Sequence, residues 1–268
     1  MKRRDTETYH AYAHRVFKEL GIYDLQGLIH QGDNYYSGIE AYQVKCFSEF
    51  SNTGFEKVLE LARLSFCEQL DAEYNVIVTS EKTQKHRIDK ACKVGQDMVW
   101  LEGQELNGTE LVNWWKIRQP FNQKKAMYEA KSRIKDSKID ELLFSNSLAW
   151  GVNIDGFTIH DGKVNAIIEK RITKASSVPY YDTNIFFNGS YSKSGDYPSW
   201  SILWELAKKF NVPLFLMTFD HKGNEQVGLT RIINVTTNGL HYHEDIKPNQ
   251  QIFTSDIIGI KNYISNFT

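Results

Sequence analysis

Two carboxylates flank a predicted hairpin turn in the second half of the sequence and are its clearest candidates for chemistry. Asp155 precedes the Asp-Gly pair at 161–162, a strong turn signal between alternating apolar residues, and Glu169 follows it. A hairpin brings the two carboxylates side by side, where they repel each other unless a divalent cation lies between them. Mg²⁺ suits such a site because it takes few protein oxygens and keeps several water ligands. The spacing therefore predicts a Mg²⁺ site that activates water against a phosphate ester.

Two basic residues follow Glu169 directly. Arg171 shares the strand face of Glu169 because side chains alternate along a strand, and Lys170 lies on the other face. Either cation would contact the phosphate or orient the attacking water. The alternative is a surface hairpin in which Asp155 sits in a turn and Glu169 pairs with a neighbouring base.

An amide and an ammonium two residues apart form a second candidate, in the segment GIEAYQVKCF at 38–47. Gln43 and Lys45 share one face of a predicted strand, whereas the residues between and beside them are typical of a core. A Gln oxygen ligates a metal ion or hydrogen-bonds to its water, and a Lys stabilises charge on a phosphate. The pair therefore predicts half of a metal and phosphate site.

The first candidate resembles the core of the PD-(D/E)xK nuclease superfamily. The segment NIDGFTIHDGKVNAIIEKR is similar to the pattern of an Asp on one strand and a Glu and a Lys two apart on the next. Asp155 and Glu169 match the acidic positions, which implies that they bind the metal ion, and Arg171 stands at the Lys position. Because an Arg stays protonated, Arg171 would stabilise phosphate charge without accepting a proton, unless Lys170 reaches round to the site. The resemblance covers about 124–220.

The second candidate resembles the Mrr-like branch of the same superfamily, in which Gln replaces the second acidic residue. Gln43-Val44-Lys45 matches that Q-x-K motif. After it, Mrr-like domains continue with a helix, a strand ending in Thr-Ser, another helix, and a strand that runs into a Gly and a final helix. The sequence from about 40 to 115 fits this order.

The first acidic residue of the Q-x-K site has two candidates. The family has an Asp, usually in a Gly-rich hairpin before the motif, and Asp33 in HQGDNYYSG is the first choice. Glu40 lies on the opposite pleat from Gln43 in a regular strand, so it joins the site only if a bulge at Gly38 redirects it. The resemblance implies that one of these acids binds a metal ion together with Gln43.

The resemblance implies a metal-dependent DNA endonuclease of the restriction or phage-defence kind, which hydrolyses phosphodiester bonds with Mg²⁺ or Mn²⁺. Its substrate is expected to be DNA, with RNA not excluded, and a homodimer or a partner protein stays open. Neither motif is complete, which leaves open that one domain has lost cleavage. The alternative is a non-catalytic nucleic-acid-binding or assembly subunit built from decayed nuclease domains. A third interpretation is an enzyme that acts on a small phosphate ester.

The elements that must position these residues follow an α/β plan that occurs twice. The first half is predicted to contain a helix at 6–20, a hairpin that ends in the Gln43 strand, a helix from about 55, a strand at 75–80, a helix at 81–95, a strand at 97–103 and a final helix. The second half is predicted to contain a helix at 124–143, strands at 152–159 and 163–172, a long loop, a helix from 198, and strands at 213–219 and 227–237.

Two restriction-endonuclease-like domains, each with a mixed β-sheet flanked by helices, are therefore expected. Their ranges are 1–119 and 124–268, with a boundary at 118–125 where Pro120 interrupts a helix. The similarity between the halves is one of plan and not of residues.

Composition indicates an ordinary globular protein. Of the 268 residues, 41% are hydrophobic and 24% charged, and no apolar run is long enough to span a membrane. Three cysteines without a CxxC pair predict reduced thiols in a cytoplasmic protein. A net charge of −1 means that any contact with nucleic acid comes from local basic patches. It favours a partner protein that supplies part of the DNA contact.

Two further features are weaker candidates. His241 and His243, with Glu244 nearby, favour a surface strand over a zinc site because other ligands are lacking in the neighbouring sequence. The long aromatic loop at 173–197 follows the Glu169 strand and is expected to close over DNA.

Overall fold

The computed structural model describes residues 7–31, 34–52, 56–95, 97–119, 138–173, 178, 187, 197–220, 226–242, 251–254 and 256–267. The chain divides into two compact units. The central unit comprises Leu25–Asn153, and the terminal unit comprises Met1–Asp24 together with Ile154–Thr268. The chain is mixed α/β, with helices flanking mixed β-structure in both units, which confirms this part of the predicted fold class.

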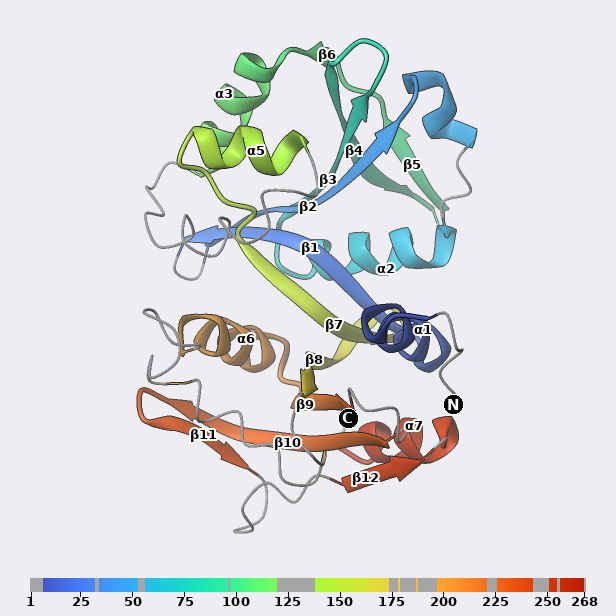
Figure 1. Ribbon diagram of the computed structural model, residues 1–268, viewed down its shortest axis with the longest axis vertical. Helices are drawn as coiled ribbons and strands as arrows, with labels where there is room; N and C mark the ends of the chain where they lie inside the picture. The colour runs from blue at the N-terminus through green and yellow to red at the C-terminus, as the bar shows by residue number, and fades with distance from the viewer. Residues whose placement is uncertain are drawn as a thin grey trace. The chain divides into compact units, whose positions relative to one another are not determined.

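A hairpin, a crossover helix and three further strands form the sheet of the central unit. Its elements are β1 (Ile22–Gln31, which begins in the terminal unit), β2 (Asn34–Val44), the 3-10 helix η1 (Phe47–Asn52), α2 (Lys57–Glu68), β3 (Glu73–Ser80), β4 (His86–Val94), β5 (Asp97–Leu101), β6 (Glu105–Leu106), α3 (Gly108–Arg118) and α5 (Lys138–Ser145). The strand order is β1-β2-β3-β4-β5, and β6 also pairs with β4 (Figure 1). Only β2 and β3, which α2 connects, run parallel.

Helices α3 and α5 supply one part of the central core. Trp115 of α3 is fully buried, and its indole Nε1–H donates to the carbonyl of Ala149 at 3.0 Å. Asn107 and Glu110 form a capping box that fixes the start of α3. The buried cluster around these helices contains Ile29, Ile39, Ile77, Leu111, Val112, Trp115, Ile139, Leu143 and Leu148.

The terminal unit repeats the same order of strands. Its elements are α1 (Tyr9–Leu20), β7 (Val152–His160), β8 (Lys163–Thr173), α6 (Tyr197–Phe210), β9 (Leu214–Asp220), β10 (Gln226–Thr236), β11 (Gly239–Tyr242), β12 (Gln251–Thr254) and α7 (Ile257–Ser265). The strand order is β7-β8-β9-β10-β11, and β12 pairs with β10 (Figure 1). Here β8 and β9, connected through α6, are the parallel pair.

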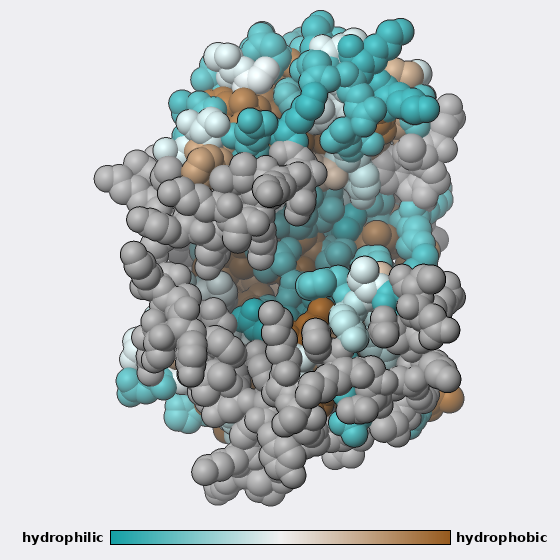
Figure 2. Space-filling view, in the orientation of Figure 1, coloured by the Kyte–Doolittle hydropathy of each residue, from teal (hydrophilic) through white to brown (hydrophobic). Residues whose placement is uncertain are grey.

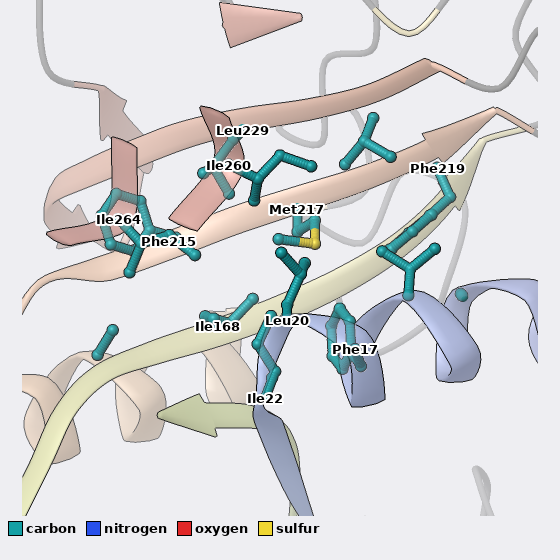
Figure 3. Close-up of a cluster of buried hydrophobic side chains, with 14 of the residues drawn as sticks. Phe17, Leu20, Ile22, Ile168, Phe215, Met217, Phe219, Leu229, Ile260 and Ile264 are labelled. Atoms are coloured by element: carbon teal, nitrogen blue, oxygen red, sulfur yellow. The ribbon is translucent and has the colours of Figure 1, made fainter. Parts of the chain in front are cut away.

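Helix α1 packs on the sheet of the terminal unit. Phe17 and Leu20 of α1 lie in one buried cluster with Ile168 of β8 and with Met217 and Phe219 of β9 (Figure 3). Apolar residues of α7 complete the cluster. Thr8 caps α1 at its start, and Gly21 ends it in the left-handed conformation, at φ 72°.

The two units differ from the predicted ranges 1–119 and 124–268 in the helix that precedes each set of strands. Those ranges assign each helix to the strands that follow it in sequence. In the structure α1 belongs to the terminal unit, and α5, which precedes β7, belongs to the central unit. The boundary predicted at 118–125 falls where α3 ends, and its later residues, with most of the helix predicted at 124–143, lie outside the described residues.

The helix predicted at 81–95 is wrong, because the chain there forms β4. Arg87 and Asp89 lie two residues apart, and Arg87 Nη2 donates to Asp89 Oδ2 at 2.8 Å from the same side of the strand. Both side chains are buried, and Asp89 Oδ1 also accepts from the backbone N–H of Gly103. In the sequence alone, these buried charged residues of β4 have the same pattern as the polar face of an amphipathic helix.

Most of the remaining described elements confirm the predicted types, whereas η1, β6, β12 and α7 correspond to no prediction. The helices near 6–20, after residue 55, before Arg118 and after residue 197 are present, as are both hairpins and the predicted strands. Described surface in the view of Figure 2 is mainly hydrophilic around the central unit, with scattered hydrophobic areas. Within the described ranges, no helix has the length and apolar character needed to cross a membrane.

Candidate functional site

The hairpin of β7 and β8 brings the two carboxylates of the first candidate site together. The antiparallel register runs from the turn as far as Gly156 and Ile168. Asp155 directly precedes Gly156 and Glu169 directly follows Ile168, so both residues stand at the same end of the hairpin, one position beyond its last pair. The backbone N–H of Lys170 donates to Asp155 Oδ2 at 3.1 Å, which holds the Asp155 side chain against β8.

Arg171 neutralises Glu169 on that face. Glu169 is only 7% exposed, and Arg171 Nη2 lies 3.0 Å from its Oε1. The guanidinium carbon of Arg171 lies 5.9 Å from the ring centroid of Trp200, which α6 contributes. The β7–β8 site, meaning Asp155, Glu169 and Arg171, therefore lies on the face of the sheet that α6 covers. A buried carboxylate is tolerated there because it has a paired cation.

Lys170 lies on the opposite face, as the alternation predicts. Its Nζ is 5.4 Å from the ring centroid of Phe17 in α1. Only its backbone N–H contacts the β7–β8 site. The structure therefore does not bring the Lys170 ammonium beside Glu169.

A polar row on β9 extends the site and was missed in the sequence. Thr218 pairs with Arg171 and Asp220 with Thr173 in the parallel register, so these side chains follow Glu169 along one face. Thr218, Asp220 and Thr173 are all buried. The available signal was two polar residues, spaced by two, at the end of the otherwise apolar strand LFLMTFD.

Asp155 and Glu169 are the carboxylate donors that the β7–β8 site offers to a divalent cation. In the part of the chain that the structure describes, no group of three or more His, Cys, Asp or Glu side chains is close enough to hold a metal ion. Mg²⁺ needs fewer, because it is usually held by one or two carboxylates plus water and substrate phosphate. Asp155 and Glu169 fit that requirement, provided that Glu169 exchanges its contact with Arg171 for the cation.

Gln43 and Lys45, the Q-x-K pair, lie exposed at the end of β2. Gln43 Nε2 donates to Glu81 Oε1 at 2.7 Å, just after β3. The backbone N–H of Lys45 donates to Glu49 Oε2 at 3.2 Å. The carbonyl of Lys45 also accepts from Ser80 Oγ and from the backbone N–H of Lys82, so the pair is tied to the end of β3 and the segment after it.

Glu40 is separated from Gln43 by the pleat. It is 6% exposed, its Oε1 accepts from the backbone N–H of Gln26 at 2.6 Å, and its Oε2 lies 3.3 Å from Arg63 Nη2 of α2. β2 keeps a regular register with β3 through this stretch, so no bulge at Gly38 redirects Glu40. Asp33, the other predicted acid, lies outside the described residues.

A buried polar network surrounds Arg63. Glu60 Oε1 accepts from Arg63 Nη1 at 2.9 Å and from Tyr42 at 2.8 Å, and its Oε2 accepts from Tyr74 at 2.5 Å. Burial lowers the pKa of Arg63, but the charge of Glu40 and its other neighbours outweighs burial and raises the pKa above the ordinary value. Burial, and then the charge of Glu60, raise the pKa of both tyrosines, so they stay protonated donors.

Of the weaker candidates, only His241 and a few residues of the long loop fall within the described ranges. Thr236 Oγ1 and His241 Nε2 lie 3.4 Å apart near the end of β10. His243, Glu244 and nearly all of the loop at 173–197 lie outside the described residues.

Comparison of the chain with protein-family models, curated proteins and solved structures found no match.

Proposed function

We propose that this protein is a divalent-metal-dependent endonuclease that hydrolyses phosphodiester bonds at the β7–β8 site. The observation that carries the proposal is the placement of Asp155 and Glu169 on adjacent strands, each one position beyond the last pair of the hairpin, with Arg171 paired to Glu169. The order hairpin, helix α6 and parallel strand β9 also follows the plan of the nuclease core that the motif resembles.

In this proposal each side chain has a separate task. Asp155 and Glu169 hold Mg²⁺ or Mn²⁺, which when bound lowers the pKa of a water ligand and stabilises charge on the phosphate. Asp155 is oriented by the backbone N–H of Lys170. Arg171 pairs with Glu169 in its buried position and would turn to the phosphate when Glu169 takes up the cation. Because an Arg does not accept a proton, the proton of the attacking water passes to solvent or to the substrate.

Plasmid DNA incubated with the protein and Mg²⁺ or Mn²⁺ tests the proposal. The wild type is expected to cut, and Asp155→Asn is expected to lower the rate by about 10²-fold or more, the usual effect of removing a charge-stabilising group from an active site. Asp161→Asn is the matched control, because Asp161 lies in the turn of the same hairpin with its side chain 90% exposed. A wild type that cuts neither DNA nor RNA with either metal contradicts the proposal, as does turnover of small phosphate esters alone.

A non-catalytic nucleic-acid-binding subunit is the second candidate. It is favoured by one observation: Arg171 stands where the pattern has a Lys and is paired with Glu169, while the Lys170 ammonium lies on the other face. Such a subunit would retard labelled DNA or RNA in a gel without cutting it in Mg²⁺ or Mn²⁺. The same incubation, with the products and the retarded complex measured together, therefore separates the two functions.

A further inference from the structure

The two units share one topology around their central hairpin. In the central unit β1 and β2 form a hairpin, α2 follows, and β3 returns parallel to β2. In the terminal unit β7, β8, α6 and β9 repeat these steps in the same order. Two antiparallel strands then extend both sheets on the same side.

The hairpins also share their register. Gly27 pairs with Ile39 in the first, and Gly156 pairs with Ile168 in the second. Each first strand carries a register shift starting two residues after its glycine, at Ile29/His30 and at Thr158/Ile159. A bulge at the same point of two hairpins is a specific feature, because bulges interrupt a ladder at defined positions.

One side-chain hydrogen bond occurs at the same position of both hairpins. The residue before the glycine accepts from the backbone N–H of the residue after the glutamate. In the terminal unit Lys170 N–H donates to Asp155 Oδ2 at 3.1 Å, and in the central unit Ala41 N–H donates to Gln26 Oε1, also at 3.1 Å. Gln26 thus corresponds to Asp155, and Glu40 to Glu169.

The cation beside the glutamate comes from a different element in each unit. Arg171, on β8 itself, pairs with Glu169 and is 28% exposed as a side chain. Its counterpart on β2 is Tyr42, and Arg63 of α2 pairs with Glu40 instead, with a side chain only 6% exposed. The helix-borne guanidinium is also bonded to Glu60, so it is fixed between two carboxylates.

We propose that the chain is an internal duplication, and that the central unit holds a closed copy of the acidic site at Gln26 and Glu40, with Arg63 in place of a metal ion. Gln26 supplies no negative charge and its Oε1 accepts from Ala41 N–H, while Glu40 already has its two oxygens engaged by Gln26 N–H and Arg63. The Q-x-K pair at Gln43 lies on the other face and is no part of this copy.

The consequence, which rests on the proposed function, is a single hydrolytic site in each chain. A monomer with one site cleaves one strand in each binding event. Supercoiled plasmid is therefore expected to accumulate as nicked circles before linear product appears.

Binding of Mn²⁺ to the full-length chain, counted by electron paramagnetic resonance, tests the closed copy independently of cleavage. The wild type is expected to bind one Mn²⁺, with Asp155→Asn losing it and Glu40→Gln keeping it. The variant Gln26→Asp/Arg63→Met is expected to gain a site, and Mn²⁺ should raise its melting temperature more than that of Arg63→Met alone.

Loss of the bound Mn²⁺ in Glu40→Gln or Gln43→Ala would place a metal site in the central unit and overturn the inference. Absence of the extra site in a folded Gln26→Asp/Arg63→Met variant, checked by circular dichroism, would also overturn it. If that variant does not fold even with Mn²⁺, the number of Mn²⁺ ions bound by Glu40→Gln and by wild type tests the inference. Failure of the proposed function would appear differently: the wild type would bind no Mn²⁺. The site gained in Gln26→Asp/Arg63→Met could still be measured in that case.

Discussion

At the level of single residues, Glu169 and Glu40 occupy the same position in their hairpins but have different neighbours. Glu169 pairs with an Arg two residues along its own strand, whereas Glu40 pairs with an Arg from a helix. The Arg171 side chain is 28% exposed, whereas that of Arg63 is 6% exposed and pairs with both Glu40 and Glu60. The neighbours, and not the glutamate, therefore separate a candidate active site from a structural ion pair.

Removal of Arg63 is the first prediction at this scale. Arg63→Met should destabilise the protein by about 3–5 kcal/mol, because it leaves two buried carboxylates without their cation. Urea unfolding measures the change. Lys57→Met is the matched control, since Lys57 pairs with Asp97 in solvent and its loss should leave the midpoint almost unchanged. Equal effects of the two variants would contradict the account of a buried network.

His86 predicts how stability depends on pH. Burial, and then the charge of Lys138, lower the pKa of His86, which bonds Thr79 Oγ1 through Nδ1 at 3.0 Å. Because the folded pKa lies below the unfolded value of about 6.5, protonation favours the unfolded chain. Stability from this group is full above about pH 6.5 and is lost as the pH falls through the folded pKa.

Denaturation midpoints at two pH values on either side of that window check this prediction. The wild type should lose stability on acidification, and His86→Gln should lose less. An equal loss in both proteins would show that other groups carry the pH dependence.

At the scale of elements, the close approach of β1 to the segment before β7 gives the next prediction. A Cβ on Gly27 would lie 2.3 Å from the carbonyl oxygen of Trp150, which is backbone and cannot rotate away. Gly27→Ala should therefore destabilise the central unit by about 1–3 kcal/mol. Gly108→Ala is the control, because the nearest atom is Leu142 Cδ1 at 3.4 Å and alanine favours the helix. Thermal melting of both variants measures the difference, and equal melting temperatures would contradict the packing.

Elements set by local signals could be predicted from the sequence, and elements set by distant partners could not. The β7–β8 hairpin was predicted because the Asp-Gly turn and the alternation are local. β4 was read as a helix because the pairing of Arg87 with Asp89 becomes visible only in an extended strand. Arg63 was not predicted as the partner of Glu40, because α2 brings it there from 23 residues further along the chain. The row of Thr218 and Asp220 needed the parallel register of β9.

At the scale of the whole molecule, the assignment of α1 to the terminal unit makes a prediction that the sequence ranges did not. Deletion of residues 1–20 removes Phe17 and Leu20 from the cluster on β8 and β9. Hydrogen exchange should then speed up in β9 and β10 and stay unchanged in β3, because β3 lies in the central unit. Faster exchange in β3 with β9 unchanged would contradict the division into units.

We propose that the acidic pair on β7 and β8, and not the Q-x-K pair on β2, performs hydrolysis. The most direct measurement compares nicking of supercoiled plasmid in Mn²⁺ by wild type, Glu169→Gln and Lys45→Ala at equal concentrations. The account predicts that Glu169→Gln loses nicking by about 10²-fold or more while Lys45→Ala keeps the wild-type rate. An inactive Lys45→Ala beside an active Glu169→Gln would contradict it and move the hydrolytic site to the central unit.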